Sequence, residues 1–174
     1  MTSVSIRPAA PADIPAITRI YAHAVAHGTA SFELEAPDEA EMAQRMRALL
    51  DGGFPYLAAE LDSALAGYAY AGLYRTRPAY RFSVEDSIYI APQAQRRGVG
   101  RALLERLIAE SESRGFRQMI AVIGDSAQTA SIELHRDAGF RLIGTIENVG
   151  FKFDRWVDSV LMQRALGPGA TTKP

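Results

Sequence analysis

Residues 87–104 read Ser-Ile-Tyr-Ile-Ala-Pro-Gln-Ala-Gln-Arg-Arg-Gly-Val-Gly-Arg-Ala-Leu-Leu, a run that changes from β-prone to helical residues. The segment from Ile88 to Ile90 is β-prone, and Pro92 ends the expected strand because proline has no backbone donor for the ladder. From Val99 the apolar residues recur at helical spacing, up to a stop signal at Gly115. The stretch therefore predicts a strand, a basic turn and a helix in succession.

The turn between this strand and this helix has the features of an anion site. Gly98 and Gly100 carry no Cβ, so a ligand can approach backbone amides that a larger residue would cover. The first turn of a helix also leaves amides without intrahelical partners, and the helix dipole places partial positive charge there. Arg96, Arg97 and Arg101 add full charges. The spacing matches neither a Walker loop nor the dinucleotide fingerprint, so the sequence predicts a pyrophosphate seat of another kind.

The rest of the chain alternates short β-prone runs with amphipathic helical segments. The expected strands cover residues 4–7, 56–61, 64–73, 84–90, 119–123, 141–147 and 156–162. The expected helices occupy residues 13–27, 38–51, 99–114 and 126–138, each followed by a glycine. A linker around Gly150 is expected between the last two strands. This order of elements predicts an α/β fold with a mixed sheet and helices on both faces.

The composition is typical of a globular protein with one domain. The chain has 174 residues and a mass of 18.9 kDa, enough for one well-cored domain, which we expect to span residues 1–166. We expect residues 167–174 to form a disordered tail. The formal net charge of -1 argues against a nucleic-acid-binding module, because such a module carries a large basic face.

Residue types exclude several kinds of site. The sequence has no cysteine, which excludes disulfides, thiolate zinc sites and cysteine nucleophiles. The three histidines, His23, His27 and His135, lack clustered carboxylates, so we expect no metal site. The sequence shows neither a signal-peptide pattern nor an apolar run of membrane-spanning length. These features predict a cytoplasmic protein that binds neither nucleic acid nor membranes.

The pattern Gln95-x-x-Gly98-x-Gly100 between a strand and a helix resembles the acetyl-coenzyme A motif of the GNAT superfamily of N-acetyltransferases. Further matches resemble the phosphinothricin and methionine sulfoximine acetyltransferase branch. They are Ile6-Arg7-Pro8, Thr29-Ala30-Ser31-Phe32, Val84-Glu85-x-Ser87-Ile88-Tyr89-Ile90, Ala130-Ser131-x-x-Leu134-His135-x-x-x-Gly139-Phe140 and Gly150-Phe151-Lys152-Phe153-x-Arg155-Trp156-x-Asp158. The resemblance implies the GNAT fold, a central mixed, mostly antiparallel sheet of about seven strands flanked by about four helices.

Two positions depart from that branch. Gln128 stands ahead of the Ala130-Ser131 pair, where the branch usually has an asparagine. Asp154 stands where the branch favours a glycine. These departures leave open how residue 128 reaches the coenzyme and which conformation the chain adopts at residue 154.

The resemblance implies a site for acetyl-CoA as a co-substrate, without a metal. The expected coenzyme-binding residues are Ile88, Tyr89, Ile90, Gln95, Arg96, Arg97, Gly98, Val99, Gly100, Arg101, Gln128, Ser131 and His135. In this fold the strand carrying Ile88 to Ile90 separates from its neighbour, so that its amides bind pantetheine and the amide of Ile90 faces the thioester oxygen. The alternative is a strand that is fully paired inside the sheet.

The same resemblance implies two catalytic residues. Glu85 matches the acidic residue thought to remove the ammonium proton, directly or through water, because a protonated amine has no lone pair. Asp86 is the competing base, since alternation along a strand lets one of the two face the substrate unless a bulge intervenes. The alternative is that either carboxylate pairs with Arg75 or Arg81. His135 takes the place of a tyrosine near the coenzyme sulfur, where it is expected to protonate or contact the departing thiolate.

Acceptor recognition is expected from a second group of residues. They are Phe32, Arg75, Thr76, Arg77, Glu85, Asp86, Ser87 and Lys152. Arginine forks match carboxylate, phosphinate or sulfone-like oxygens, and Phe32 is expected to form an apolar wall. The alternative is a solvated arginine loop. The aromatic residues around Lys152 favour a homodimer interface over an ordinary hairpin.

The sequence is therefore interpreted as an N-acetyltransferase that moves the acetyl group of acetyl-CoA to the α-amine of a small amino-acid analogue. Methionine sulfoximine, methionine sulfone and phosphinothricin are the expected acceptors. Direct transfer is favoured because the chain has no cysteine and no evident serine triad to carry an acyl group. Two alternatives remain open: an acetyltransferase acting on protein amino termini or lysines, and a non-catalytic acyl-CoA sensor.

Overall fold

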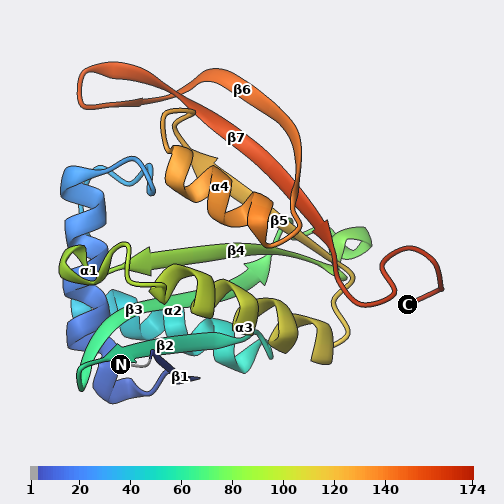
Figure 1. Ribbon diagram of the computed structural model, residues 1–174, viewed down its shortest axis with the longest axis horizontal. Helices are drawn as coiled ribbons and strands as arrows, with labels where there is room; N and C mark the ends of the chain where they lie inside the picture. Colours follow the sequence, from blue (N-terminus) through green and yellow to red (C-terminus); the bar gives the residue numbers. More distant parts are fainter. Residues whose placement is uncertain (1–3) are drawn as a thin grey trace.

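A seven-stranded sheet forms the centre of the structure, in the order β1-β2-β3-β4-β5-β7-β6 (Figure 1). The computed structural model describes residues 4–174. The strands are β1 (Ser5–Pro8), β2 (Tyr56–Leu61), β3 (Ala64–Leu73), β4 (Ser83–Ile90), β5 (Gln118–Gly124), β6 (Arg141–Lys152) and β7 (Arg155–Ala165). Neighbouring strands are antiparallel, except that β4 and β5 run parallel. The predicted mixed, mostly antiparallel sheet is confirmed.

Four α-helices accompany this sheet in the described part of the chain. The helices are α1 (Ile14–His27), α2 (Glu39–Asp51), α3 (Val99–Ser113) and α4 (Thr129–Asp137), with short 3-10 turns η1 (Pro11–Asp13), η2 (Pro78–Tyr80) and η3 (Pro92–Ala94). Asp38 caps α2, since its side chain accepts a hydrogen bond from the amide of Glu41 at 2.8 Å. No helix among residues 4–174 has the length and apolar character needed to cross a bilayer.

Strand pairing determines which helices meet which face of the sheet. Tyr68 of β3 lies opposite Tyr89 of β4, and the ring of Tyr21 from α1 contacts Tyr89 edge-on, with centroids 4.9 Å apart. The next pair along, Gly67 and Ile90, faces the other side, where α3 packs. In Figure 1, α3 and α4 lie in front of the sheet and α2 behind it. Successive residues of β4 therefore face different helix layers.

Helix α3 forms where the sequence predicts it. Its apolar stripe is buried and consists of Val99, Leu103, Leu104, Leu107 and Ile108. Burial of each large apolar side chain stabilises the fold by roughly 1.5–3 kcal/mol. Gly98 precedes the helix with φ +83°, and Gly115 follows it with φ +84°. Both have the left-handed conformation that disfavours other residues, so these two glycines delimit the helix.

Strands β4 and β5 separate after three paired positions. Their parallel ladder joins residues 83–85 to residues 118–120, while β4 continues to Ile90 without a partner in β5. The expected separation of this strand is confirmed, and full pairing inside the sheet is excluded. Val122 of β5 is 38% exposed and lines the opening between the two strands.

The last two strands are longer than predicted. Strand β6 continues through Gly150, so the expected linker is wrong, and a register shift between Ile146 and Gly150 absorbs the extra residues as a bulge. Phe153 and Asp154 form the hairpin turn, with φ of 53° and 54°. Positive φ at both positions is typical of a tight two-residue hairpin turn, which answers the question left open at Asp154.

The end of the chain packs back onto the domain. Leu166 is fully buried. The guanidinium of Arg117 donates hydrogen bonds to the carbonyl oxygens of Gly169 and Lys173 and to the hydroxyl of Thr172. Residues 167–174, for which the sequence predicts disorder, therefore form turns held by one arginine in the structure.

Candidate active site

A cleft of about 770 Å³ opens where β4 and β5 separate. Its walls come from α1, β4, the turn before α3, β5 and α4. Of the predicted site residues, the cleft is lined by Glu85, Asp86, Ser87, Ile88, Tyr89, Ile90, Gln95, Arg96, Gly98, Val99, Gly100, Arg101, Gln128, Ser131 and His135. The predicted residues outside its lining are Phe32, Arg75, Thr76, Arg77, Arg97 and Lys152. The structure thus brings together most of the residues expected to bind acetyl-CoA. Much of the group expected to bind the acceptor amine lies outside the lining of the cleft.

The turn before α3 presents open backbone to the cleft. Apart from the adjoining backbone, no described atom lies within 4 Å of the position that a Cβ on Gly98 would take. A Cβ on Gly100 would meet side-chain atoms alone, at 3.4 Å or more. Amides exposed at the start of a helix suit a pyrophosphate, which accepts hydrogen bonds from N–H groups. Arg97 instead pairs with Asp62, at 2.9 Å, on the turn between β2 and β3.

Glu85 and Asp86 face opposite sides of β4. Glu85 lies opposite Gly72 of β3, on the face that α1 and α2 cover, and it is partly exposed. Burial raises the pKa of Glu85, the negative charge of Asp86 adds to the shift, and the charge of Arg75 opposes it. A carboxylate with a raised pKa in a cleft is suited to accepting a proton from a bound amine.

Asp86 contacts His135, which is 49 residues away in the sequence. Nε2 of His135 lies 3.0 Å from Oδ2 of Asp86, and the two side chains are 5% and 3% exposed. Nδ1 lies 2.7 Å from the carbonyl oxygen of Ser131, one turn earlier in α4. Burial alone would lower the pKa of His135, but the hydrogen bond and charge of Asp86, together with the Ser131 carbonyl, raise it. The sequence predicts Asp86 as a competing base and gives no sign of this pairing.

Gln128 links the start of α4 to the segment after α1. Its side-chain amide donates a hydrogen bond to the hydroxyl of Thr29 at 3.2 Å. That hydroxyl in turn donates to the carbonyl oxygen of Gly124 at 3.3 Å. The side chain of Gln128 therefore spans to the loop that follows α1, while the residue itself lines the cleft.

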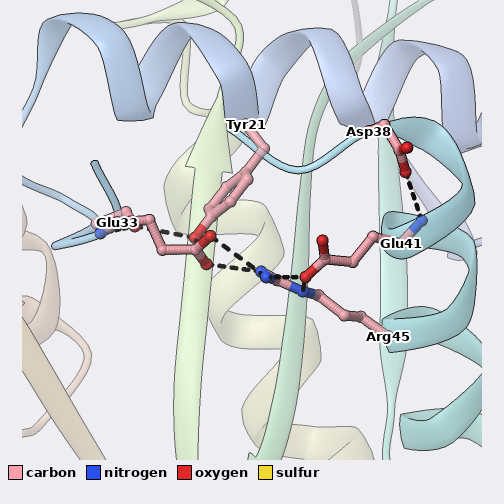
Figure 2. A network of polar contacts seen from close by, with 6 residues as sticks. Tyr21, Glu33, Asp38, Glu41 and Arg45 are labelled. Atoms are coloured by element: carbon pink, nitrogen blue, oxygen red, sulfur yellow. Dashed lines mark hydrogen bonds and ion pairs between the residues drawn. The ribbon is translucent and has the colours of Figure 1, made fainter. Parts of the chain in front are cut away.

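Residues 28–38, called the α1–α2 loop below, are held by a network of charged groups. Figure 2 shows the carboxylate of Glu33 between the hydroxyl of Tyr21, at 2.7 Å, and the guanidinium of Arg45, at 2.6 Å. Arg45 also pairs with Glu41 of α2. The hydrogen bonds from Arg45 lower the pKa of Glu33 against the effect of partial burial, and Tyr21 adds to them. The loop is thereby fixed to both helices.

Lys152 is buried instead of being open to a ligand. It is 3% exposed, and its ammonium donates hydrogen bonds to the carbonyl oxygens of Gly28, at 2.9 Å, and Ser31, at 2.7 Å. Desolvation lowers the pKa of Lys152, and the charge of Glu33 opposes this. Phe32, on the same loop, packs against glycines of β5 and β6. Lys152 thus fixes the α1–α2 loop to the β6–β7 hairpin.

The arginine segment after β3 lies at the surface. Residues 75–77 are exposed. The guanidinium of Arg75 stacks on the ring of Tyr74, 4.3 Å from its centroid, and Arg81 stacks similarly on its own neighbour. The charge of Arg75 still opposes the raised pKa of Glu85, whose main cause is burial. Residues 75–77 thus lie outside the lining of the cleft, and their contact with an acceptor stays a prediction.

Sequence reasoning missed part of the cleft wall. His23 and His27 of α1 line the cleft, with their rings stacked and centroids 4.3 Å apart. Val122 and Gly124 of β5 line it as well. The helical spacing of the two histidines was a usable signal. The apolar run of β5 gave none, because such a run looks the same whether or not the neighbouring strand diverges.

Comparisons with known proteins agree with this geometry. The model of the acetyltransferase (GNAT) family matches residues 17–140. The chain is 58% identical over 162 residues to phosphinothricin N-acetyltransferase of Alcaligenes faecalis, which covers 93% of this chain and 82% of that protein. It is 39% identical over 163 residues to L-methionine sulfoximine/L-methionine sulfone acetyltransferase of Salmonella typhimurium, covering 94% of this chain and 95% of that protein.

A solved structure agrees closely as well. The crystal structure of a GNAT superfamily phosphinothricin acetyltransferase from Sinorhizobium meliloti in complex with acetyl-CoA has a TM-score of 0.96 and 48% sequence identity. The match covers 98% of this chain and 92% of that one. Fold, cleft and sequence therefore lead to one conclusion: the chain belongs to the acetyltransferase (GNAT) family.

Proposed function

We propose that the chain transfers the acetyl group of acetyl-CoA to the α-amine of a small amino-acid analogue, such as methionine sulfoximine, methionine sulfone or phosphinothricin. The observation that carries this proposal is the position of Glu85. Its carboxylate, with a raised pKa, lines the same cleft as the glycine turn before α3. Relatives named for these acceptors support the choice of substrate class.

The residues of the cleft divide the reaction between them. Acetyl-CoA brings an activated acetyl group, for which the open amides before α3 form the seat. The amide of Ile90, on the part of β4 that has left β5, donates a hydrogen bond to the oxyanion that forms on attack. Glu85 takes the ammonium proton, directly or through water, and so frees the lone pair of the amine. His135 supplies a proton to the departing thiolate.

Thiol release from acetyl-CoA with a panel of amines tests this function. The panel contains methionine sulfoximine, phosphinothricin, methionine sulfone and short peptides. We expect turnover with the amino-acid analogues and little with the peptides. Preference for peptides would favour a protein acetyltransferase instead, and coenzyme binding without turnover on any amine would favour a sensor.

Replacing Gly98 tests the coenzyme seat. Gly98→Ala places a Cβ on a left-handed residue, which destabilises the fold by about 1–2 kcal/mol, and it narrows the approach to the amides. Gly115→Ala is the matched control, because Gly115 has φ +84° and open space beyond the other end of α3. We expect similar losses of unfolding free energy in both variants, but weaker acetyl-CoA binding by calorimetry in Gly98→Ala alone. Equal coenzyme affinity in the two variants would contradict the seat.

We also propose that two copies of the chain associate through the β6–β7 hairpin. This hairpin exposes Leu142, Ile143, Ile146, Val149, Phe151, Phe153 and Trp156. Trp156 is 60% exposed, and a second copy would remove this apolar surface from water. Sedimentation should give twice the 18.9 kDa mass for the parent and a monomer for Trp156→Glu. Leu50→Glu, at an exposed apolar residue of α2, should stay dimeric, and a parent that sediments at 18.9 kDa would contradict the dimer.

A further inference from the structure

The hydrogen bonds of His135 determine how many protons its ring carries. Nδ1 lies 2.7 Å from a carbonyl oxygen, and because a carbonyl only accepts hydrogen bonds, Nδ1 carries a proton. Nε2 lies 3.0 Å from Oδ2 of Asp86, and an ionised carboxylate also only accepts. Without a proton between them, two lone pairs would face each other in a buried site. The geometry thus requires one shared proton in addition to the proton on Nδ1.

The surroundings of the pair contain few other charges. Glu85 is adjacent on β4 but faces the opposite side of the sheet. Arg101 of α3 pairs with Glu105 at the surface, at 2.9 Å. The ring of Phe140 packs edge-on against His135 from the apolar side. Asp86 is therefore the group that decides the protonation of this imidazole.

The pair also belongs to the cleft. Both residues line it, together with the part of β4 that has left β5. Oδ1 of Asp86 is buried and has no hydrogen-bond partner among residues 4–174, so this carboxylate is held chiefly by His135. An ionised carboxylate in such a place needs a cationic partner, because an unpaired buried charge is strongly unfavourable.

We propose that Asp86 is a positioning residue that keeps a proton on Nε2 of His135, so that the pair stores the proton taken by the departing thiolate. That Nε2 of His135 holds this proton follows from the geometry alone, whereas the transfer of the proton to the thiolate rests on the proposed function. In that step the amine nitrogen bonds to the carbonyl carbon, the C–S bond breaks with its electron pair on sulfur, and sulfur takes the shared proton. Of the two protons that the ammonium group loses, one replaces the shared proton, and the other leaves to solvent through Glu85.

Asp86→Asn tests the positioning role with minimal change of shape. The asparagine amide can donate to Nε2, so the hydrogen bond survives with its direction reversed and the ring is stabilised in its neutral form. Loss of the carboxylate charge should lower the pKa of His135, because the hydrogen bond and the charge of Asp86 are what raise it. Asp137→Asn is the matched control, because it removes an exposed carboxylate from the same helix. That control should leave the titration of His135 unchanged.

Nitrogen NMR of the histidine-labelled protein measures these states directly. The chain has three histidines, and the loss of one signal in His135→Gln assigns His135. In the parent without substrates, both ring nitrogens of His135 should carry protons at neutral pH. In Asp86→Asn, only Nδ1 should. A parent ring protonated on Nδ1 alone, or an unchanged titration in Asp86→Asn, would overturn the proposal.

Kinetics separate positioning from a structural role. We expect Asp86→Asn to lower kcat about tenfold or more, with little change in the KM for acetyl-CoA. The alkaline limb of the kcat profile should move to lower pH together with the NMR titration. If the alkaline limb moved without the NMR titration of His135, or the titration moved without the limb, the transfer of the proton from His135 to the thiolate would be contradicted. If the parent turns over no amine, the proposed function fails, while the NMR result still decides whether Asp86 holds the proton.

Discussion

Glu85→Gln should lower kcat by about two to four orders of magnitude while acetyl-CoA still binds. The amide keeps the size of the side chain but cannot take a proton, and an ammonium group has no lone pair for attack. Glu85 lies on the face of β4 opposite that of Asp86 and His135, so the donor side of the cleft stays intact. Thiol release measures the turnover, and calorimetry measures the coenzyme affinity.

The control for this change is Glu133→Gln, which removes the same charge from an exposed position on α4. Its activity should equal that of the parent. Undiminished acetylation by Glu85→Gln would transfer the role of base to Asp86 or to solvent. The two carboxylates can be told apart, because Glu85→Gln should abolish the acid limb of the pH profile, whereas Asp86→Asn should retain that limb and move it to lower pH by removing the Asp86 charge that raises the pKa of Glu85.

The pH dependence of activity and stability follows from the raised pKa of Glu85. Burial and the charge of Asp86 cause the shift, so the acid limb of kcat/KM should lie at higher pH than for a solvated glutamate. Because the folded pKa exceeds the unfolded one, the stabilising contribution is complete below the unfolded pKa and is lost as pH rises through the folded pKa. Urea unfolding at neutral pH should therefore find Glu85→Gln at least as stable as the parent.

The parts of the site that depend on local sequence could be predicted. The glycine turn and the buried stripe of α3 follow from residue spacing within the single segment 87–115, and the structure has both at the predicted positions. The alternation of β4 likewise predicts that Glu85 and Asp86 face opposite ways. These features need no knowledge of which distant segment packs beside them.

The parts that depend on long-range register could not be predicted. His135 meets Asp86 across 49 residues, and Lys152 meets Ser31 across 121. Residue type suggested a ligand contact for Lys152, but its charge holds the α1–α2 loop instead. The same applies to Arg97, which pairs with Asp62 across 35 residues. The type of a charged side chain can be read from the sequence, whereas its partner depends on how the sheet and the loops pack.

Gly124→Ala should displace the α1–α2 loop, whose residues Gly28 and Ala30 line the cleft, more than alanine at any other glycine of β5 or β6. A Cβ on Gly124 would lie 1.9 Å from the carbonyl oxygen of Thr29 and 2.8 Å from the ring of Phe32. The backbone oxygen cannot rotate away, so the α1–α2 loop has to move. Such overpacking lowers the unfolding free energy by about 1–3 kcal/mol. We expect the KM for the acceptor amine to rise about tenfold or more, while the turn before α3 keeps most of its affinity for acetyl-CoA.

Alanine at two glycines of β6 should have smaller effects than Gly124→Ala. A Cβ on Gly150 would meet side-chain atoms of Phe32 and Val157 at 2.6 and 2.9 Å, and side chains can shift where a backbone cannot. A Cβ on Gly144 would meet nothing within 4 Å. Urea unfolding and acceptor KM should therefore both follow the order Gly124→Ala, Gly150→Ala, Gly144→Ala, from largest to smallest change. If Gly124→Ala resembled Gly144→Ala in acceptor KM, the position of the α1–α2 loop would not govern acceptor binding, and the wall would have to be sought along α1, at His23 and His27.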